Sequence, residues 1–339
     1  MNNLLTILMV TLVVLTVAGG CSNQTDVIVY SANDIGSWDI FSINAGTGEQ
    51  HRLTSSQCDE HYFACSPDGG KIAFVARCRN TQNELRIINA DGSDERILLK
   101  NNLIDDSPIS WSPDSSQVVF SLRVQKDTTH YRNLFIINID GSDLKRLTTT
   151  PGWDSYPVWS PTGNLIAYIT NNTSLNIVNA ENGESRCLSD SLQYYQDISW
   201  SPDGKEIVFV APNPAHVLYK ISINNGELTM ILHGPPSDTW DQPQWSPDGT
   251  KIAFVSNNDI FVVPSEGGEA QQLTFSSEYE QNPIWSRSGE KIAFSYIEGV
   301  NTNTGTNEDL YIMNKDGSDQ INLTNTPEIN EDFPEFLNK

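Results

Sequence analysis

The stretch WSPDGKEIVFV at residues 200–210 returns as WSPDGTKIAFV at residues 245–255. Related five-residue starts are CSPDG at 65, WSPDS at 111, WSPTG at 159 and WSRSG at 285. Each is followed by an apolar run, then by a second apolar run that ends in a turn such as DGSD and a short RLT, QLT or NLT segment. A period of about 45 residues is typical of repeat proteins built from small β-sheets.

Each repeat predicts four short strands. The first strand ends at the Trp, and Ser-Pro-Asp-Gly supplies a tight turn because Pro presets φ, Asp bonds local amides and Gly accepts a positive φ. The second and third strands are apolar on both faces, as in sheets that pack between neighbouring sheets. Since one such sheet cannot bury both faces alone, the copies must pack face to face around an axis. The sequence therefore predicts an all-β fold, a β-propeller of four-stranded antiparallel blades.

The number of blades follows from the first-strand ends at 65, 111, 159, 200, 245 and 285, with a weaker seventh at Phe336 in DFPEF. The N-terminal segments VIVYS (from Val27), WDIFSIN (from Trp38) and HRLT (from His51) lack a first strand, whereas DFPEF lacks the other three. Pairing of the two ends predicts a seven-bladed propeller over residues 27–339, closed by the N-terminal strands plus a C-terminal strand. Closure removes the exposed sheet edges that promote aggregation.

The first 20 residues form a different kind of segment. Residues 4–18 are uncharged and largely apolar, short for a membrane span, and small residues follow them. We expect residues 1–20 to be a signal peptide. VAGGC at 17–21 resembles a bacterial lipoprotein box, which implies a lipidated Cys21 with a short tether at 21–26. The protein is then exported and held by its lipid anchor to a membrane of the bacterial cell envelope, either periplasmic or at the surface.

The charge of the chain excludes one class of partner. The chain carries 43 acidic and 20 basic residues, a net charge of −23. Nucleic-acid binding requires clustered Lys and Arg, so we expect no nucleic-acid partner. A basic protein or peptide is the partner that such a charge attracts. The five His residues have no metal-binding spacing. We expect no cofactor and a monomeric propeller, with calcium at the mouth of the central channel as an alternative.

The candidate ligand-binding residues lie in the loops that join one blade to the next. With the loops between second and third strands, these loops define one face of the propeller, here called the loop face; the SPDG and DGS turns define the opposite turn face. The candidates are Asp59, Glu60, Asp105, Asp106, Trp153, Asp154, Tyr195, Asp197, Trp240, Asp241, Glu280 and Asp332. Two interpretations remain open: the carboxylates stabilise turns and neighbouring backbone, or they form an acidic funnel for a basic segment, a cation or a sugar.

Four cysteines follow Cys21. Cys58 and Cys78 fall in loop-face loops of adjoining strands, so a disulfide between them is geometrically plausible in an exported protein. Cys65 replaces the repeat Trp and Cys187 lies in a fourth strand, and we expect both to be buried thiols.

The WSPDGxxIAF and DGSxxxxLT motifs resemble those of the TolB-like β-propeller family, which is related to WD-repeat propellers, over residues 27–336. The resemblance is specific for the fold and carries little about function. TolB has a further N-terminal α/β domain, so we expect a TolB-like protein other than TolB itself. No G-x-S-x-G nucleophile elbow of the related peptidases occurs in the chain.

Functions from different classes fit this sequence. We expect a non-enzymatic cell-envelope propeller that binds a protein or peptide through its acidic and aromatic loop face and has no catalytic residues. The alternative is a carbohydrate-active enzyme, a hydrolase or lyase, that uses funnel carboxylates such as Asp241 and Asp332 as acid and base. A purely structural surface protein is a third possibility.

Overall fold

The computed structural model describes residues 26–337, apart from 34–35, 61, 80, 106, 127, 191–196, 212–215, 236–238, 299–306 and 327–328. The predicted signal peptide at 1–20, the lipidation residue Cys21, and the candidates Asp106 and Tyr195 lie outside the described residues. All regular elements of the described chain are β-strands, so the all-β prediction is confirmed. Within these residues no helix is long and apolar enough to cross a membrane.

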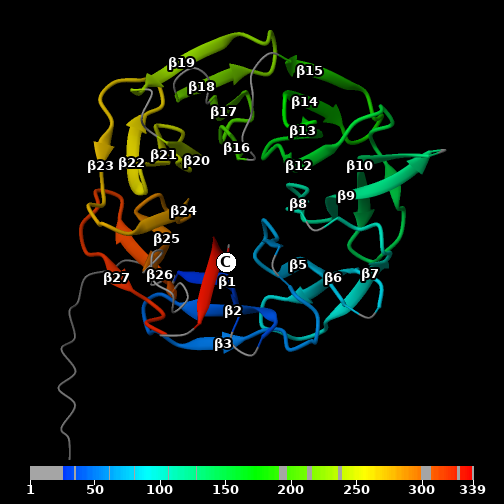
Figure 1. The fold of residues 1–339 in the computed structure, drawn as a ribbon, viewed down its shortest axis with the longest axis horizontal. Helices are drawn as coiled ribbons and strands as arrows, with labels where there is room; N and C mark the ends of the chain where they lie inside the picture. The colour runs from blue at the N-terminus through cyan, green and yellow to red at the C-terminus, as the bar shows by residue number, and fades with distance from the viewer. Residues whose placement is uncertain are drawn as a thin grey trace, which may run out of the picture.

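The strands form five four-stranded antiparallel sheets and one eight-stranded sheet, which follow one another around a common centre (Figure 1). The first sheet has β4 (Phe63–Cys65), β5 (Lys71–Ala76), β6 (Glu84–Asn89) and β7 (Arg96–Lys100). The second has β8 (Ser110–Trp111), β9 (Gln117–Lys126), β10 (Thr129–Asn138) and β11 (Lys145–Arg146). The third has β12 (Asp154–Trp159), β13 (Leu165–Thr170), β14 (Ser174–Asn179) and β15 (Ser185–Ser189). The fourth has β16 (Ile198–Trp200), β17 (Glu206–Ala211), β18 (Val217–Ser222) and β19 (Leu228–His233). The fifth has β20 (Trp240–Trp245), β21 (Lys251–Ser256), β22 (Asp259–Pro264) and β23 (Gln271–Gln272).

The eight-stranded sheet contains strands from both ends of the described chain. It holds β24 (Tyr279–Trp285), β25 (Lys291–Glu298), β26 (Asn307–Asn314), β27 (Ile321–Asn322), β28 (Asn330–Phe336), β1 (Val27–Asn33), β2 (Trp38–Asn44) and β3 (Gln50–Arg52). β28 pairs antiparallel with β1 along most of its length, as the sequence predicts for DFPEF. Among the described residues, backbone pairing between the groups β24–β27 and β28–β1–β2–β3 is limited to one parallel pair, Glu308 with Asn330.

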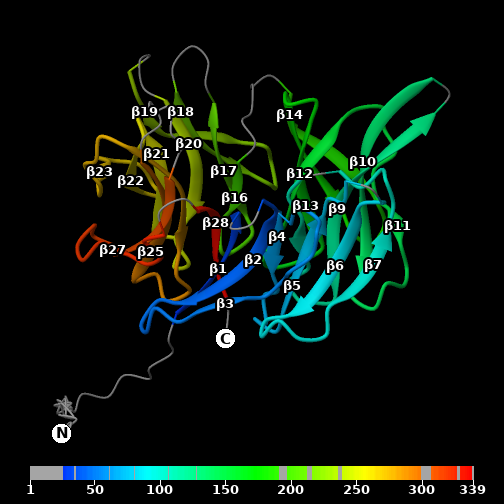
Figure 2. The same cartoon turned by 60° about the horizontal axis from the view of Figure 1, so that its bottom comes forward.

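The first strand of each four-strand group lies toward the centre and the fourth lies at the periphery (Figure 1). Neighbouring sheets stand side by side with their faces toward each other (Figure 2). We call β4, β8, β12, β16, β20, β24 and β28 the inner strands. They end at Cys65, Trp111, Trp159, Trp200, Trp245, Trp285 and Phe336, the seven positions predicted from the repeat.

The core lies between neighbouring sheets. The second strands are buried along almost their whole length, as in β5 and β17. Three repeat indoles link neighbouring sheets: the indole Nε1 of Trp111 donates a hydrogen bond to the Ala64 carbonyl of the preceding inner strand at 2.8 Å. Trp200 and Trp285 donate in the same way to the Val158 and Gln244 carbonyls. Each of these three indoles is therefore hydrogen-bonded to the sheet that precedes it.

The SPDG segments form the predicted turns. In the turn after β16, the Asp203 carboxylate accepts hydrogen bonds from the Ser201 hydroxyl and the Lys205 amide, and Gly204 adopts a φ of 67°. Asp68, Asp114 and Asp248 accept equivalent bonds in their own turns. These aspartates belong to the fold, as expected from their place in the repeat.

The cysteines differ in state and exposure. Cys58 and Cys78 form a disulfide, with Cα atoms 4.4 Å apart. Cys65 is a buried free thiol, as expected. The expectation for Cys187 is wrong, because its thiol is exposed: β15 is an outermost strand and turns one face to solvent.

Replacing both Cys58 and Cys78 with Ala is expected to lower the free energy of unfolding by about 2–4 kcal/mol, because the cross-link restricts the unfolded chain. The disulfide joins residues 20 positions apart. Denaturant-induced unfolding measures the difference. The control Cys187→Ala removes an exposed free thiol and should change stability by about 0.5 kcal/mol or less. A double variant as stable as the parent would contradict this prediction.

Candidate functional site

Five of the predicted loop-face carboxylates are buried, and three of them, Glu60, Asp154 and Glu280, share one arrangement. The Glu280 carboxylate accepts a hydrogen bond from the Thr274 hydroxyl, which itself accepts the Ile260 amide at 2.9 Å. Thr274 follows the fourth strand of one sheet and Glu280 begins the inner strand of the next, so this bond ties neighbouring sheets together. The same hydrogen bond between a Thr hydroxyl and a carboxylate is present in four pairs: Thr54 with Glu60, Thr148 with Asp154, Thr274 with Glu280, and Thr324 with Glu331. We call these pairs the threonine–carboxylate junctions.

Burial perturbs the protonation of these carboxyl groups. Desolvation raises the pKa of Glu60, Glu280 and Glu331 to about 7, although the hydroxyl hydrogen bonds act in the opposite direction. Desolvation also raises the pKa of Asp154. Their hydrogen bonds and burial make these groups parts of the sheet junctions rather than an exposed acidic funnel. A sequence signal existed, because the Thr of each L-T segment precedes its carboxylate by six or seven positions.

Other predicted residues do lie in loop-face loops, but they are paired with arginines. Asp105 is buried and forms ion pairs with Arg123 at 3.1 Å and Arg132 at 2.8 Å. The Arg132 guanidinium lies 5.0 Å from the ring centre of Trp153, whose side chain is 48% exposed. Asp59 is a neighbour of Arg79 at 3.7 Å.

The Cys58–Cys78 disulfide lies beside a surface hollow. Asp59, Cys58, Cys78 and Arg79 line a loop-face cavity of about 560 Å³. Its lining therefore includes the disulfide, one acidic side chain and one basic side chain.

Trp240, another candidate, is a core residue. It is 5% exposed and packs against Phe254 with ring centres 5.3 Å apart. A Cβ at position 234 would overlap the Trp240 ring, so Gly234 is required for this indole to pack.

A second cavity, of about 270 Å³, lies among the inner strands and is called the central cavity here. Phe63 of β4, Gln242 and Gln244 of β20, and Asn282 of β24 line one part of it. The rest is lined by Asp197 before β16, by Pro283 and Ile284 of β24, and by Phe333, Pro334 and Glu335 of β28. Of the predicted site residues that the structure describes, only Asp197 lines this cavity directly.

A repeated backbone irregularity points side chains toward the centre. Four residues have a positive φ and are each followed by Pro: Tyr156 at 53°, Gln242 at 52°, Asn282 at 53° and Phe333 at 52°. The register of the ladder shifts at each of these places. Such left-handed residues cost about 1–3 kcal/mol when they are not Gly, and they cluster at functional sites. A bulge of this kind redirects one side chain out of the pleat. The recurring Pro two residues before the strand end was the available sequence signal.

Side-chain amides link the inner strands around the central cavity. The Gln242 Nε2 donates to the Asn282 Oδ1 at 2.8 Å, and the Asn282 backbone amide donates to the Gln242 Oε1 at 2.6 Å. The Asn282 Nδ2 then donates to the Asp332 Oδ1 at 2.7 Å. Three successive inner strands are thus joined by one hydrogen-bonded chain, which fixes the direction of each amide.

Two carboxyl pairs flank this chain. Burial and the neighbouring, hydrogen-bonded Asp241 carboxylate raise the pKa of Asp197 well above its usual range. Burial and Asp332 raise the pKa of Glu308 in the same way. The raised pKa values of Asp197 and Glu308 mean that each of these two carboxyls holds its proton near neutral pH. Asp241 and Asp332 each contact a different partner carboxyl, so the structure does not bring these two candidates together as a pair.

Glu335 was not predicted and also faces the central cavity. Its Oε2 accepts the Cys65 backbone amide at 2.9 Å, and burial raises its pKa to about 7. The amide belongs to β4 and the carboxyl to β28, so this bond joins one further inner strand, β4, to β28. Within the described ranges, no group of three or more His, Cys, Asp or Glu side chains is arranged to hold a metal ion.

Comparison with known proteins supports the same architecture. The family model of the TolB beta propeller domain matches residues 108–217, and that of the dipeptidyl peptidase IV N-terminal region matches residues 214–298. A TolB homolog of Chlorobium chlorochromatii (strain CaD3) is 27% identical over 143 residues, which are 42% of this chain and 31% of that protein. The chain spans between 20% and 59% of the length of the curated relatives that it matches.

Two solved structures share the fold at low identity. TolB from Acinetobacter baumannii has a TM-score of 0.58 at 17% identity, covering 92% of this chain and 66% of that one. An oligogalacturonate lyase in complex with manganese has a TM-score of 0.69 at 12% identity, covering 84% and 85%. The sheets around a common centre, with a polar cavity among their inner strands, define a β-propeller protein. The family match over residues 108–217 and the TolB relatives make the chain similar to the TolB-like β-propellers.

Proposed function

We propose that the protein is a non-enzymatic binding scaffold of the bacterial cell envelope, and that a protein or peptide segment binds at its central cavity. The observation that carries the proposal is the lining of that cavity by the amides of Gln242 and Asn282 beside the ring of Phe333. Amides offer both donors and acceptors to a peptide backbone, and the ring offers an apolar contact. The hydrogen-bonded chain through Asn282 preorganises these groups, which lowers the entropic cost of binding.

We infer that the propeller has seven blades and is closed. Pairing of β28 with β1 gives the group β28–β1–β2–β3 the same four-strand form as the other sheets. The eight-stranded sheet then consists of two blades joined by the single Glu308–Asn330 pair. A closed ring has only short, protected edges and holds its inner strands at fixed distances.

The proposal includes export and a lipid anchor at Cys21. The Asp26 carbonyl accepts the Ala45 amide at 2.9 Å, so the described chain starts beside a turn of the turn face. A tether of five residues reaches at most roughly 18 Å. The turn face would then lie near the membrane and the loop face would point away from it. Release of a Cys21→Ala variant from the membrane fraction tests the anchor.

A carbohydrate-active enzyme is the second candidate, because Asp197 and Asp241 meet beside the central cavity and the pKa of Asp197 is raised. The catalytic carboxyls of glycosidases stand roughly 5–10 Å apart, on either side of the scissile bond. Asp197 and Asp241 instead hydrogen-bond each other. This geometry favours a binding role. Calcium near these carboxyls remains a proposal, which a melting curve with and without millimolar calcium tests.

One set of variants separates the two functions. Capture of envelope proteins by the immobilised protein should fall about tenfold or more in Asn282→Ala or Phe333→Ala, the loss typical of a central contact. Met230→Ala, which truncates an exposed side chain on the outer strand β19, should capture as the parent does. Asp197→Asn should also bind normally, because an amide replaces a carboxyl of a pair that already holds a proton.

An enzyme would respond differently to the Asp197 change. Turnover of a polysaccharide would fall by about 10²–10⁴-fold on loss of a general acid or base. Capture that is unchanged by Asn282→Ala and Phe333→Ala would overturn the scaffold proposal. Polysaccharide cleavage that Asp197→Asn abolishes would support the enzyme instead.

A further inference from the structure

Among the six SPDG-type turns that the structure describes, neighbouring turns touch one another on the turn face, except between the turns after Trp111 and Trp159. A Cβ at Gly249 or Gly289 would contact Pro202 or Pro247 of the preceding turn at 3.7 and 3.8 Å. The Asp68 amide donates to the Ser115 hydroxyl of the next sheet at 3.1 Å. At Gly163, by contrast, no atom lies within 4 Å of a Cβ position. The turn face is therefore open between the sheet β8–β11 and the sheet β12–β15.

Trp159, at this same junction, differs from three of the other repeat indoles. The Nε1 groups of Trp111, Trp200 and Trp285 donate to an inner-strand carbonyl of the preceding sheet. The Trp159 Nε1 donates to the Gly163 carbonyl of its own turn at 3.0 Å. Its ring therefore lies toward the turn face and forms a wall of the opening.

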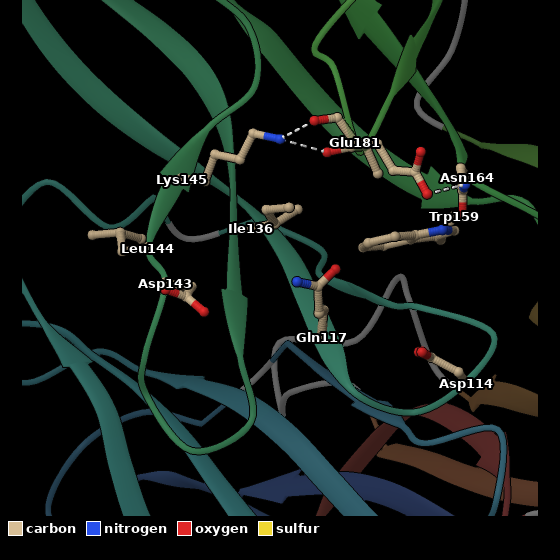
Figure 3. A pocket seen from close by; sticks show the side chains of 10 residues that line it. Asp114, Gln117, Ile136, Asp143, Leu144, Lys145, Trp159, Asn164 and Glu181 are labelled. Atoms are coloured by element: carbon tan, nitrogen blue, oxygen red, sulfur yellow. Dashed lines mark hydrogen bonds between the residues drawn. The ribbon is translucent and has the colours of Figure 1, made fainter.

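The opening contains a cavity of about 560 Å³ and a smaller neighbour of about 240 Å³. Both are lined by Asp114, Gln117, Trp159 and Asn164. We call the larger one the junction pocket; Figure 3 shows the Trp159 ring at one side, with Gln117 below it and Asp143 and Leu144 opposite. It belongs to the turn face and shares no residue with the central cavity.

The charged groups of the junction pocket favour a cationic ligand. Asp114, Asp143 and Glu181 bring three carboxylates to its lining. The Ser112 and Ser116 hydroxyls lower the pKa of Asp114, so this group stays ionised at neutral pH. Lys145 is the one basic residue of the lining, and its Nζ donates to the Ala180 and Glu181 carbonyls (Figure 3). The Lys145 ammonium group is thereby bound to backbone carbonyls of the neighbouring sheet.

An indole beside carboxylates is a combination that binds ammonium and guanidinium groups. The same protein contains an internal example on the loop face. There the Arg132 guanidinium lies over the Trp153 ring and pairs with Asp105 at 2.8 Å. In the junction pocket the corresponding ring is Trp159 and the corresponding carboxylates are Asp143 and Glu181.

We propose that the junction pocket is a second binding site, independent of the central cavity, for an arginine or lysine side chain of a basic peptide segment. The cationic head packs against the Trp159 ring and pairs with Asp143 and Glu181, while the exposed Leu144 side chain contacts the aliphatic part. The net charge of −23 attracts such a segment over longer distances.

Titration of the full chain with N-acetyl-arginine amide tests the site. The ¹H–¹⁵N signal of the Trp159 indole should shift saturably, and added salt should weaken binding. Asp143→Asn should weaken binding about threefold or more, since it removes one charge contact. Asp94→Asn is the matched control: Asp94 holds the same DGSD position with a positive φ in another repeat and does not line the pocket. It should bind as the parent does.

The ring is tested with Trp159→Phe against Trp111→Phe. Ligand-observed NMR should show about fivefold or greater weakening in the first and none in the second, because Phe is a poorer cation acceptor than Trp. Asn282→Ala, in the central cavity, should leave this binding unchanged. Equal binding of the uncharged citrulline analogue, preferential binding of cellobiose, or no saturable shift at Trp159 would each overturn the proposal.

Discussion

Replacing Glu60, Glu280 and Glu331 with Gln is expected to raise the free energy of unfolding at pH 8, by about 1–3 kcal/mol for each site. Each carboxyl is buried, and burial raises its pKa from 4.5 to about 7. Above that pH the folded protein holds a desolvated charge, which the unfolded chain exposes to water. Gln keeps a hydrogen-bond acceptor for the Thr hydroxyl of the junction and carries no charge.

The pH profile gives the sign of the effect. Between pH 4.5 and about 7 the folded state binds more protons than the unfolded state at these sites, so the stability of the parent falls as pH rises through this window. The triple variant should have a flatter profile there. The control Asp203→Asn should leave the profile between pH 4.5 and about 7 unchanged. Hydrogen bonds from Lys205 and Ser201 lower the pKa of Asp203 to about 2, so this group titrates below that window. A parent whose stability is constant or rises from pH 5 to pH 8 would falsify this account of the threonine–carboxylate junctions.

Phe336→Ala is expected to lower the free energy of unfolding by about 3–5 kcal/mol, the usual cost of truncating a buried ring. Phe336 is 7% exposed and packs in one cluster with Ile28 of β1 and Leu310 of β26. The ring therefore contacts strands from both ends of the described chain. If the C-terminal strand closes the propeller, its loss weakens the whole fold.

The matched control is Phe275→Ala, since the Phe275 side chain is 78% exposed. It should change stability by about 0.5 kcal/mol or less. Chemical denaturation followed by tryptophan fluorescence measures both variants. A Phe336→Ala variant within 1 kcal/mol of the parent would mean that β28 is only loosely attached, and the inferred closure would be wrong.

Most of the fold could be predicted because its signals are local. Pro, Asp and Gly dictate the SPDG turns within four residues. The end of each inner strand, from Cys65 to Phe336, therefore lies where the sequence predicts it. The burial of the second strands follows from uninterrupted apolar runs such as KIAFV at 251–255. The exposure of Cys187 could not be predicted, because the sequence does not show which face of an outermost strand is in contact with solvent.

The site was less predictable because its determinants lie between sheets. Glu280 is acidic and sits in a loop-like sequence, yet the Thr274 hydroxyl of the preceding sheet binds it inside the junction. The role of Asn282 and Phe333 in the cavity could not be predicted, because a residue before Pro is normally extended. In the structure both adopt a positive φ. The orientation of Trp159 depends on how far two turns stand apart, which no single repeat encodes.

The left-handed residues before Pro in the inner strands lie outside the regular strand pairing that stabilises the fold. At positions 156, 242, 282 and 333 the ladder is already interrupted, and the Pro that follows has no N–H to contribute. Gln242, Asn282 and Phe333 line the central cavity, so substitutions at these three positions alter its lining without removing regular strand pairing. Asn or Gly tolerates the required backbone best. A combinatorial library confined to these three positions would sample new binding specificities on one unchanged scaffold.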